Sequence, residues 1–92
     1  MIRSFADKDV EKLFGDIPVA KFKNIERIAR RKLIFLNQAR SLQDLKSPPN
    51  NCLEALKKDR VGQYSIRINK QYHLCFLWEN NDAYNVEIVD YH

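Results

Sequence analysis

The sequence predicts an α+β fold, in which N-terminal helices pack on one face of a mainly antiparallel sheet of four to five strands. Apolar residues recur at helical spacing over residues 7–46 and alternate as in strands over residues 52–89. The connections between the later segments are only a few residues long, which favours an antiparallel meander. No change of composition marks a boundary, so residues 1–92 are predicted to form a single domain.

The N-terminal segment predicts a short strand followed by a short helix. Ile2 to Phe5 alternates apolar and polar residues, which is typical of a strand added to a sheet built mostly later in the chain. Asp7 is the predicted N-cap of the helix, and Gly15 is expected to end it.

The main helix is expected to begin at Asn24, its N-cap, and to end at Ala39 or Arg40. Its apolar stripe comprises Ile25, Ile28, Ala29, Leu33 and Leu36. Its opposite side is a basic face of Lys23, Arg27, Arg30 and Arg31. Such a face is either solvated surface or a contact for phosphates or an acidic partner segment.

The second half of the chain predicts strands. Ser41–Lys46 is expected to form one more helical turn, and the Pro-containing stretch 47–51 is the strongest break in the chain. The predicted strands that follow are Cys52–Leu56, Gln63–Ile68, Tyr72–Trp78 and Asn85–Val89. A cationic turn over residues 57–62 precedes the second of them, and three-residue turns are expected at 69–71 and 80–82.

These turn lengths predict the register of the sheet. Ile66 would oppose Leu74, and Phe76 would oppose both Tyr64 and Val86, so the bulky apolar residues share the face that the helices cover. The other face would carry Ser65, Arg67, His73, Cys75, Glu87, Val89 and Tyr91. On that face Arg67 is expected to lie opposite His73, with Tyr91 close by, whereas Asp90 falls on the core side.

Composition limits the class of protein. Sixteen Lys and Arg against 12 Asp and Glu give a net charge of +4, which suits an anionic partner such as nucleic acid. Cys52 and Cys75 are expected to be reduced, buried thiols. The first residues contain no apolar signal region, and no stretch approaches the about 18 apolar residues that a membrane span needs. A cytoplasmic location is therefore expected.

The sequence contains no recognised motif for metal or nucleotide chemistry. The two His and two Cys lack metal-ligand spacing, so no metal and no cofactor are predicted. There is no glycine-rich phosphate loop, and no Ser-His-Asp or Cys-His order stands out.

The last three residues, Asp90-Tyr91-His92, place three groups that can transfer protons at the end of the closing strand. One interpretation is an ordered strand with a polar end. The other is metal-free RNA cleavage, because RNA carries its own nucleophile, the 2′-hydroxyl. The protein then needs only to orient the reacting atoms, move two protons and neutralise the charge on phosphorus. His and Tyr suit the proton transfers, and Lys and Arg suit the charge.

Three segments resemble the HigB toxins of the RelE-like superfamily of toxin–antitoxin modules. They are the opening Met-Ile-Arg-Ser-Phe, the central Leu56–Ile68 and the closing Asn85–His92, and together the resemblance covers essentially the whole chain in order. It implies a microbial-ribonuclease-like fold and a toxin that enters the ribosomal A site and cleaves translated mRNA. It also implies a cognate helix-turn-helix antitoxin, through whose complex the toxin reaches operator DNA.

The resemblance also implies which residues form the active site. The catalytic residues expected are His92, Tyr91, Asp90, Lys57 and His73, and those expected to bind RNA phosphates are Arg67, Arg60 and Lys58. His92 would be the general acid or base, Tyr91 would orient the nucleotide or share in proton transfer, and Asp90 would hold the tail in place.

Two positions depart from the family pattern. Position 73 is commonly Arg in relatives, and position 54 is His in some active members, whereas this chain has His73 and Glu54. With a pKa near 6.5, His73 would be mostly neutral at pH 7, so cleavage would be weaker or favoured by acid. A non-catalytic or attenuated protein that binds RNA or the antitoxin is therefore the alternative, and a basic structural protein of the ribosome is a third. The expected antitoxin surface includes the basic helix Asn24–Arg40, in which Ile34 lies among exposed arginines.

Overall fold

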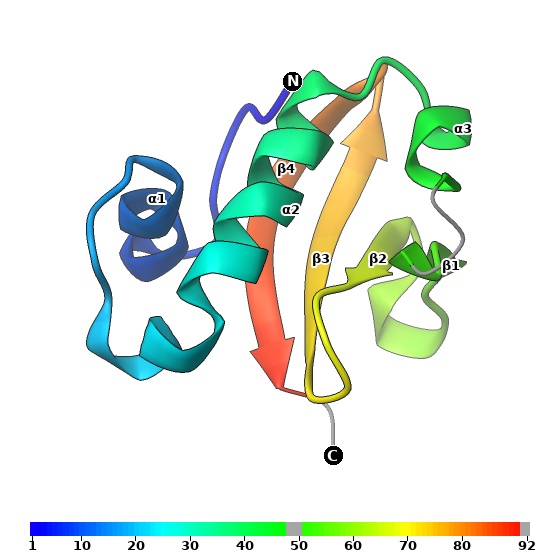
Figure 1. Cartoon of the computed structure of the whole chain (residues 1–92). Helices are drawn as coiled ribbons and strands as arrows, with labels where there is room; N and C mark the ends of the chain where they lie inside the picture. Colours follow the sequence, from blue (N-terminus) through cyan, green and yellow to red (C-terminus); the bar gives the residue numbers. More distant parts are fainter. Residues whose placement is uncertain (48–50, 91–92) are drawn as a thin grey trace.

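The structure, a computed structural model, describes residues 1–47 and 51–90, apart from the side chain of Lys58. Its elements are α1 (Lys8–Phe14), the 3-10 helix η1 (Ala20–Ile25), α2 (Glu26–Gln38), α3 (Leu42–Leu45), β1 (Glu54–Ala55), the 3-10 helix η3 (Lys58–Arg60), β2 (Gln63–Arg67), β3 (Tyr72–Glu79) and β4 (Asp82–Asp90). The strands form one antiparallel sheet in the order β1-β2-β3-β4, with α2 lying across one face (Figure 1). The predicted α+β class is therefore confirmed.

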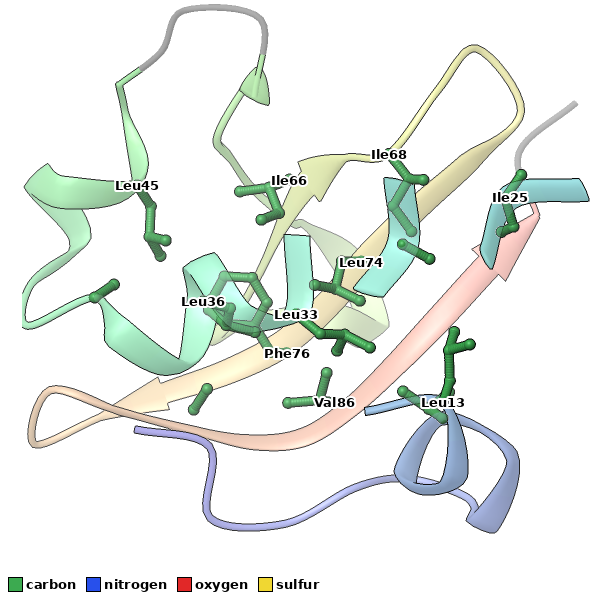
Figure 2. Close-up of a cluster of buried hydrophobic side chains, with 14 of the residues drawn as sticks. Leu13, Ile25, Leu33, Leu36, Leu45, Ile66, Ile68, Leu74, Phe76 and Val86 are labelled. Carbon is green, nitrogen blue, oxygen red and sulfur yellow. The ribbon is translucent and has the colours of Figure 1, made fainter. Parts of the chain in front are cut away.

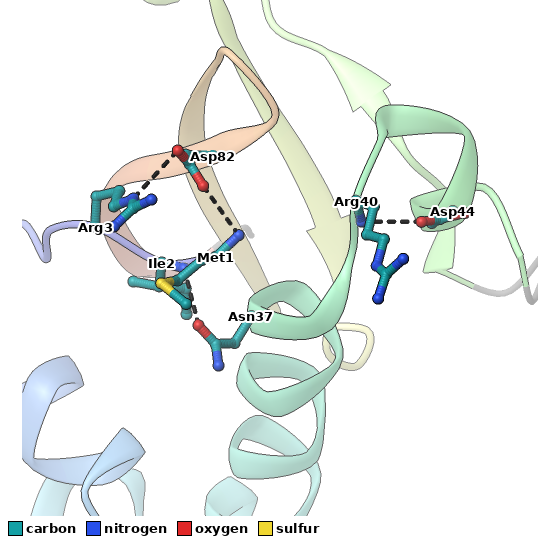
Figure 3. Close-up of polar contacts among 7 residues, drawn as sticks. All are labelled: Met1, Ile2, Arg3, Asn37, Arg40, Asp44 and Asp82. Atoms are coloured by element: carbon teal, nitrogen blue, oxygen red, sulfur yellow. Dashed lines mark hydrogen bonds and ion pairs between the residues drawn. The ribbon is translucent and has the colours of Figure 1, made fainter.

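Side-chain caps begin the two short helices: the predicted cap Asp7 in α1, and in α3 Ser41, which was predicted only as the first residue of the turn. The Asp7 side chain accepts a hydrogen bond of 3.0 Å from the backbone N–H of Val10, and α1 ends at Gly15. Ser41 caps α3 by accepting from the N–H of Asp44 at 3.3 Å. The carboxylate of Asp44 in turn accepts from the backbone N–H of Arg40 at 2.9 Å (Figure 3). Local side-chain chemistry decides these helix starts.

The predicted start of the main helix is wrong. Asn24 lies inside η1, and α2 begins at Glu26 and ends at Gln38. Ile28 is 40% exposed, so it does not belong to the buried stripe. One residue along a helix is a rotation of about 100°, which turns Ile28 away from the neighbouring buried Ala29. Arg30 is not part of an open basic face either, because its Nε donates to the carbonyl of Leu13 at 2.9 Å.

The hydrophobic core lies between α2 and the sheet. Figure 2 shows α2 residues packing against side chains of all three long strands. The fully buried members include Leu33, Leu36, Ile66, Leu74 and Phe76. The face of the sheet predicted from the register to be apolar is therefore the face that the helices cover.

The register between β2 and β3 is as predicted. Tyr64 pairs with Phe76, Ile66 with Leu74 and Arg67 with His73. Such a register is strongly specified, because a slip of one residue would place the apolar side chains on the wrong face.

The turn between β3 and β4 differs from the prediction. It has two residues, Asn80 and Asn81, with φ of 52° and 64°, so Glu79 pairs with Asp82. Positive φ at both positions is typical of a type I′ hairpin. A bulge between Cys75 and Leu77, where Asn85 has φ 52°, then shifts the register by one residue.

The bulge brings the second part of the hairpin back to the predicted pairing. Beyond it Leu74 pairs with Ile88, as expected. The predicted pair of Phe76 and Val86 is wrong, because Phe76 lies at the bulge itself. A bulge is an extra residue on one strand, which the alternation of apolar residues alone does not reveal.

The N-terminal segment joins β4 through parallel bridges at Ile2 and Phe5 rather than as a full strand. Asp82 holds the segment in place, with the Met1 amino group at 3.2 Å and Arg3 Nε at 3.1 Å (Figure 3). Burial alone would raise the pKa of Asp82, but hydrogen bonds and charges from Arg3 and the amino terminus lower it overall. The N–H of Ile2 also donates to the Asn37 side chain on α2 at 2.9 Å.

The segment after the Pro-containing break is shorter as a strand than predicted. Only Glu54 and Ala55 pair with β2, and Cys52 has φ 50°, which is incompatible with a strand. Cys52 is exposed, so the prediction that it is buried is wrong, whereas Cys75 is buried as predicted. Residues 48–50 lie outside the described residues.

Candidate functional site

The candidate site lies on the sheet face opposite the helices. Arg67 on β2 pairs with His73 on β3, so the cation and the imidazole lie side by side on adjacent strands of this face. His73 in turn pairs with Val89 on β4. Glu54 on β1 pairs with Ser65 and therefore points to the same face. The structure thus brings the predicted Arg67 and His73 together and adds a carboxylate that the sequence had marked only as a departure.

Part of this face is covered, contrary to the prediction of an open face. Ser65 is 1% exposed and Cys75 is fully buried. Arg60 of η3 reaches across to β4, where its Nη1 lies 2.7 Å from the Glu87 carboxylate, and it also donates to Gln63 at 3.1 Å. The guanidinium therefore bridges β2 and β4 on this face. Arg67 and His73, both half-buried, lie further along the same face.

The environment of His73 favours its neutral form. Burial lowers the pKa of this imidazole below its ordinary value of 6.5. The nearby carboxylate of Glu54 opposes the shift, and the positive charge of Arg67 adds to it. His73 is therefore mostly uncharged at pH 7, and Arg67 is the permanent cation of the pair.

Asp90 ends β4 in the orientation that its position in the strand predicts. It pairs with Tyr72, which packs against the hydrophobic core, so Asp90 is on the core side of the sheet. Its carboxylate accepts a hydrogen bond of 3.1 Å from the Gln71 side chain. This contact ties the end of β4 to the β2–β3 turn. The two residues that complete the predicted terminal motif, Tyr91 and His92, lie outside the described residues.

The cationic segment before β2 is held against the sheet at its far end. Lys57 is exposed, and its carbonyl accepts from the N–H of Arg60 at 3.2 Å. The ion pair between Arg60 and Glu87 anchors η3 and therefore sets where Lys57 lies. The side chain of Lys58 lies outside the described part of the structure.

Two acidic residues of this site were not predicted to take part in it. Strand alternation placed Glu87 on the correct face. Its ion pair with Arg60 was not predicted, because it joins residues that are 27 positions apart in the sequence. Glu54 lies in the predicted strand Cys52–Leu56, but its place opposite Ser65 depends on the pairing of β1 with β2, which was not predicted. Within residues 1–47 and 51–90, no three His, Cys, Asp or Glu side chains cluster closely enough to hold a metal ion.

The chain has an α+β fold, with helices on one face of an antiparallel sheet and Glu54, Arg67 and His73 on the other. Two solved structures of the YoeB–YefM toxin–antitoxin complex from Staphylococcus aureus match it, with TM-scores of 0.62 and 0.64 and sequence identities of 20% and 21%. In both, the match covers 100% of this chain and 95% of the other chain.

Sequence comparison identifies the family. A family model described as the RelE-like toxin of the type II toxin–antitoxin system HigB matches residues 3–92. The chain belongs to this HigB-like toxin family. It is 38% identical over 87 residues to Toxin HigB-1 of Vibrio cholerae, covering 92% of each chain. It is 32% identical over 94 residues to Endoribonuclease HigB of Proteus vulgaris, covering 100% of each.

A third relative adds no functional name. It is an uncharacterized protein of Haemophilus influenzae, 40% identical over 73 residues, which are 79% of this chain and 72% of the relative. In the described part of this chain, no helix is long and apolar enough to cross a membrane.

Proposed function

We propose that this toxin is a metal-independent endoribonuclease that cleaves mRNA on the ribosome, in the A site, and so stops translation and growth. The observation that carries the proposal is the Arg67–His73 pair on the sheet face opposite the helices, beside the strand that leads into Asp90-Tyr91-His92. A relative over the full chain is named an endoribonuclease, which supports the same reaction.

The reaction needs little from the protein besides positioning and proton transfer. The 2′-hydroxyl oxygen of RNA attacks the adjacent phosphorus, and the bond from phosphorus to the 5′-oxygen breaks. One proton leaves the 2′-hydroxyl and another reaches the 5′-oxygen, so the products carry a 2′,3′-cyclic phosphate and a 5′-hydroxyl. In the proposal His92 and Tyr91 transfer these protons, and Asp90, tied to the β2–β3 turn, positions the strand end.

The second requirement is positive charge from the protein that stabilises the negative charge on the phosphate. In the proposal Arg67, Lys57 and Lys58 supply the positive charge, because the lowered pKa of His73 leaves its imidazole neutral at pH 7. Arg60, also expected to bind phosphate, is engaged by Glu87 in the structure and holds η3 near the sheet. We therefore assign Arg60 a positioning role toward Lys57 in addition to any phosphate contact.

The proposed partners follow from the same reasoning. The basic balance of the chain, +4 overall, suits ribosomal RNA and mRNA. The fold neighbours are toxin–antitoxin complexes, which supports a cognate antitoxin for this chain, and we propose a helix-turn-helix protein whose complex with the toxin contacts operator DNA. Both partners place the proposed site of action in the cytoplasm.

The experiment that tests this function combines purified toxin, translating ribosomes and a defined mRNA, followed by mapping of the 5′ ends. We expect new ends inside the translated region, with 5′-hydroxyl and cyclic phosphate termini, and no cleavage of the same mRNA without ribosomes. Intact mRNA on translating ribosomes would contradict the proposal.

The lowered pKa of His73 also favours a second candidate, an attenuated toxin that retains antitoxin binding. Expression of the chain alone in a bacterium separates the two. Growth arrest that co-expression of the adjoining antitoxin gene relieves supports the nuclease, whereas normal growth together with stable antitoxin binding supports the attenuated form.

A further inference from the structure

A pocket opens on the helix side of the sheet, between α2 and the turn from β2 to β3. Its volume is about 430 Å³. The lining residues are Ile28, Arg31 and Lys32 from α2, and Arg67, Ile68, Asn69 and Lys70 from the strand end and turn. Arg67 is the one described residue of the candidate RNA site that also lines this pocket, and its Nε donates to the carbonyl of Asn69 at 3.2 Å.

The pocket carries an excess of positive charge. Four of its lining residues are cations, namely Arg31, Lys32, Arg67 and Lys70, and none is acidic. Among the described residues, none of these four forms an ion pair with a carboxylate. Burial, and then the charge of Arg31, lower the pKa of Lys32, whose ammonium group donates to the side chain of Asn51. The pocket is therefore electrostatically complementary to an anionic ligand from another molecule.

The floor of the pocket is aliphatic rather than aromatic. Ile28 is 40% exposed at its wall and Ile68 is 6% exposed beside it, and the lining contains no Phe, Tyr or Trp. Proteins that bind single-stranded RNA generally stack bases on aromatic side chains. An exposed Ile surrounded by cations is better matched by a peptide that presents an aliphatic side chain between carboxylates.

We propose that this pocket docks an acidic segment of the antitoxin, with a Leu, Ile or Val side chain against Ile28 and carboxylates facing Arg31 and Lys70. The inference rests on the antitoxin partner proposed above and specifies the surface and the chemistry of the contact.

The test measures the affinity of full-length toxin variants for the antitoxin encoded by the adjoining gene. The charge variant Arg31→Glu/Lys70→Glu changes two pocket residues outside the RNA site, and Lys8→Glu/Lys46→Glu is its control, with the same net charge at exposed positions away from the pocket. Ile28→Ala tests the aliphatic contact, and its control Ile17→Ala removes a side chain of similar exposure, 51% against 40%, outside the pocket.

We expect the charge variant to raise the antitoxin Kd by about tenfold or more and Ile28→Ala by a few-fold, with both controls within about twofold of wild type. Circular dichroism and thermal unfolding establish that each variant is folded. Equal losses in the pocket variant and its charge control, or unchanged affinity in both pocket variants, would overturn the proposal.

The same variants distinguish this proposal from its alternatives. Unchanged antitoxin affinity together with weaker mRNA cleavage in Arg31→Glu/Lys70→Glu would assign the pocket to RNA and overturn the docking proposal. A wild-type toxin that binds the antitoxin but cleaves no mRNA would contradict the proposed nuclease function alone. A wild-type toxin that binds no antitoxin would contradict the proposed partner and this docking surface together.

Discussion

The ion pair between Arg60 and Glu87 is expected to contribute measurably to stability, and Glu87→Gln tests it. The Nη1–Oε1 distance is 2.7 Å, and the two side chains are 40% and 29% exposed. Fully exposed ion pairs contribute about 0–1 kcal/mol, and hydrogen bonds to charged groups about 1.5–3 kcal/mol. This partly shielded pair should therefore contribute about 1 kcal/mol, which lowers Tm by roughly 4–8 °C in a domain of this size.

A double-mutant cycle separates this pair from the other contacts of Arg60. Urea unfolding is measured for wild type, Glu87→Gln, Arg60→Gln and the double variant, and the coupling energy is expected near 1 kcal/mol. Glu79→Gln, an exposed change on β3, is the matched control and should alter the free energy of unfolding by less than about 0.5 kcal/mol.

The same substitution should also affect cleavage, because the ion pair positions η3 and Lys57. We expect Glu87→Gln to cleave mRNA on ribosomes more slowly at a temperature where it remains fully folded. A coupling energy near zero, or full cleavage activity despite a coupling near 1 kcal/mol, would refute the reasoning that this contact builds the site.

Three further substitutions have expected outcomes. Leu33→Ala removes a fully buried α2 side chain and should lower the free energy of unfolding, measured in urea, by about 2–5 kcal/mol. Ile34→Ala, at a position that is 45% exposed, should lower it far less. Equal decreases would contradict the packing described. The folded-state pKa of His73 lies below 6.5, so just below pH 6.5 the unfolded chain binds more protons than the folded chain, and the free energy of unfolding falls as pH falls. His73→Gln should make the free energy of unfolding depend less on pH in this range. An unchanged pH profile would count against the burial of the imidazole. His73→Arg should increase mRNA cleavage and toxicity at neutral pH by restoring a permanent cation opposite Arg67, and an unchanged or lower cleavage rate would count against this role.

Local chemistry was predictable from the sequence, and contacts between distant segments were not. The predicted cap Asp7 lies next to the helix that it begins, so its residue type was sufficient. The pairing of Ile66 with Leu74 followed from a short turn and a strict alternation. The predicted length of the turn at Asn80 was wrong. A two-residue hairpin turn followed by a bulge gives the same register beyond the bulge as the three-residue turn that was predicted, so the register could not distinguish them.

The candidate site shows the same division. Strand alternation placed Arg67 and His73 on one face, and the register placed them opposite each other. It could not show that Arg60 would bridge Gln63 and Glu87, because that depends on how η3 folds back over the sheet. The exposure of Ile28 was missed for a related reason, since only the packed position of α2 decides which edge of its stripe meets solvent.

The most direct test of the central claim is to delete Tyr91 and His92 and measure mRNA cleavage on translating ribosomes. The described core ends before these two residues, so the truncated toxin should unfold at nearly the wild-type temperature and still bind the antitoxin. We expect cleavage to be abolished, because the proposed proton-transfer groups are gone. Cleavage at the wild-type rate by the truncated, folded protein would contradict an active site at the end of β4.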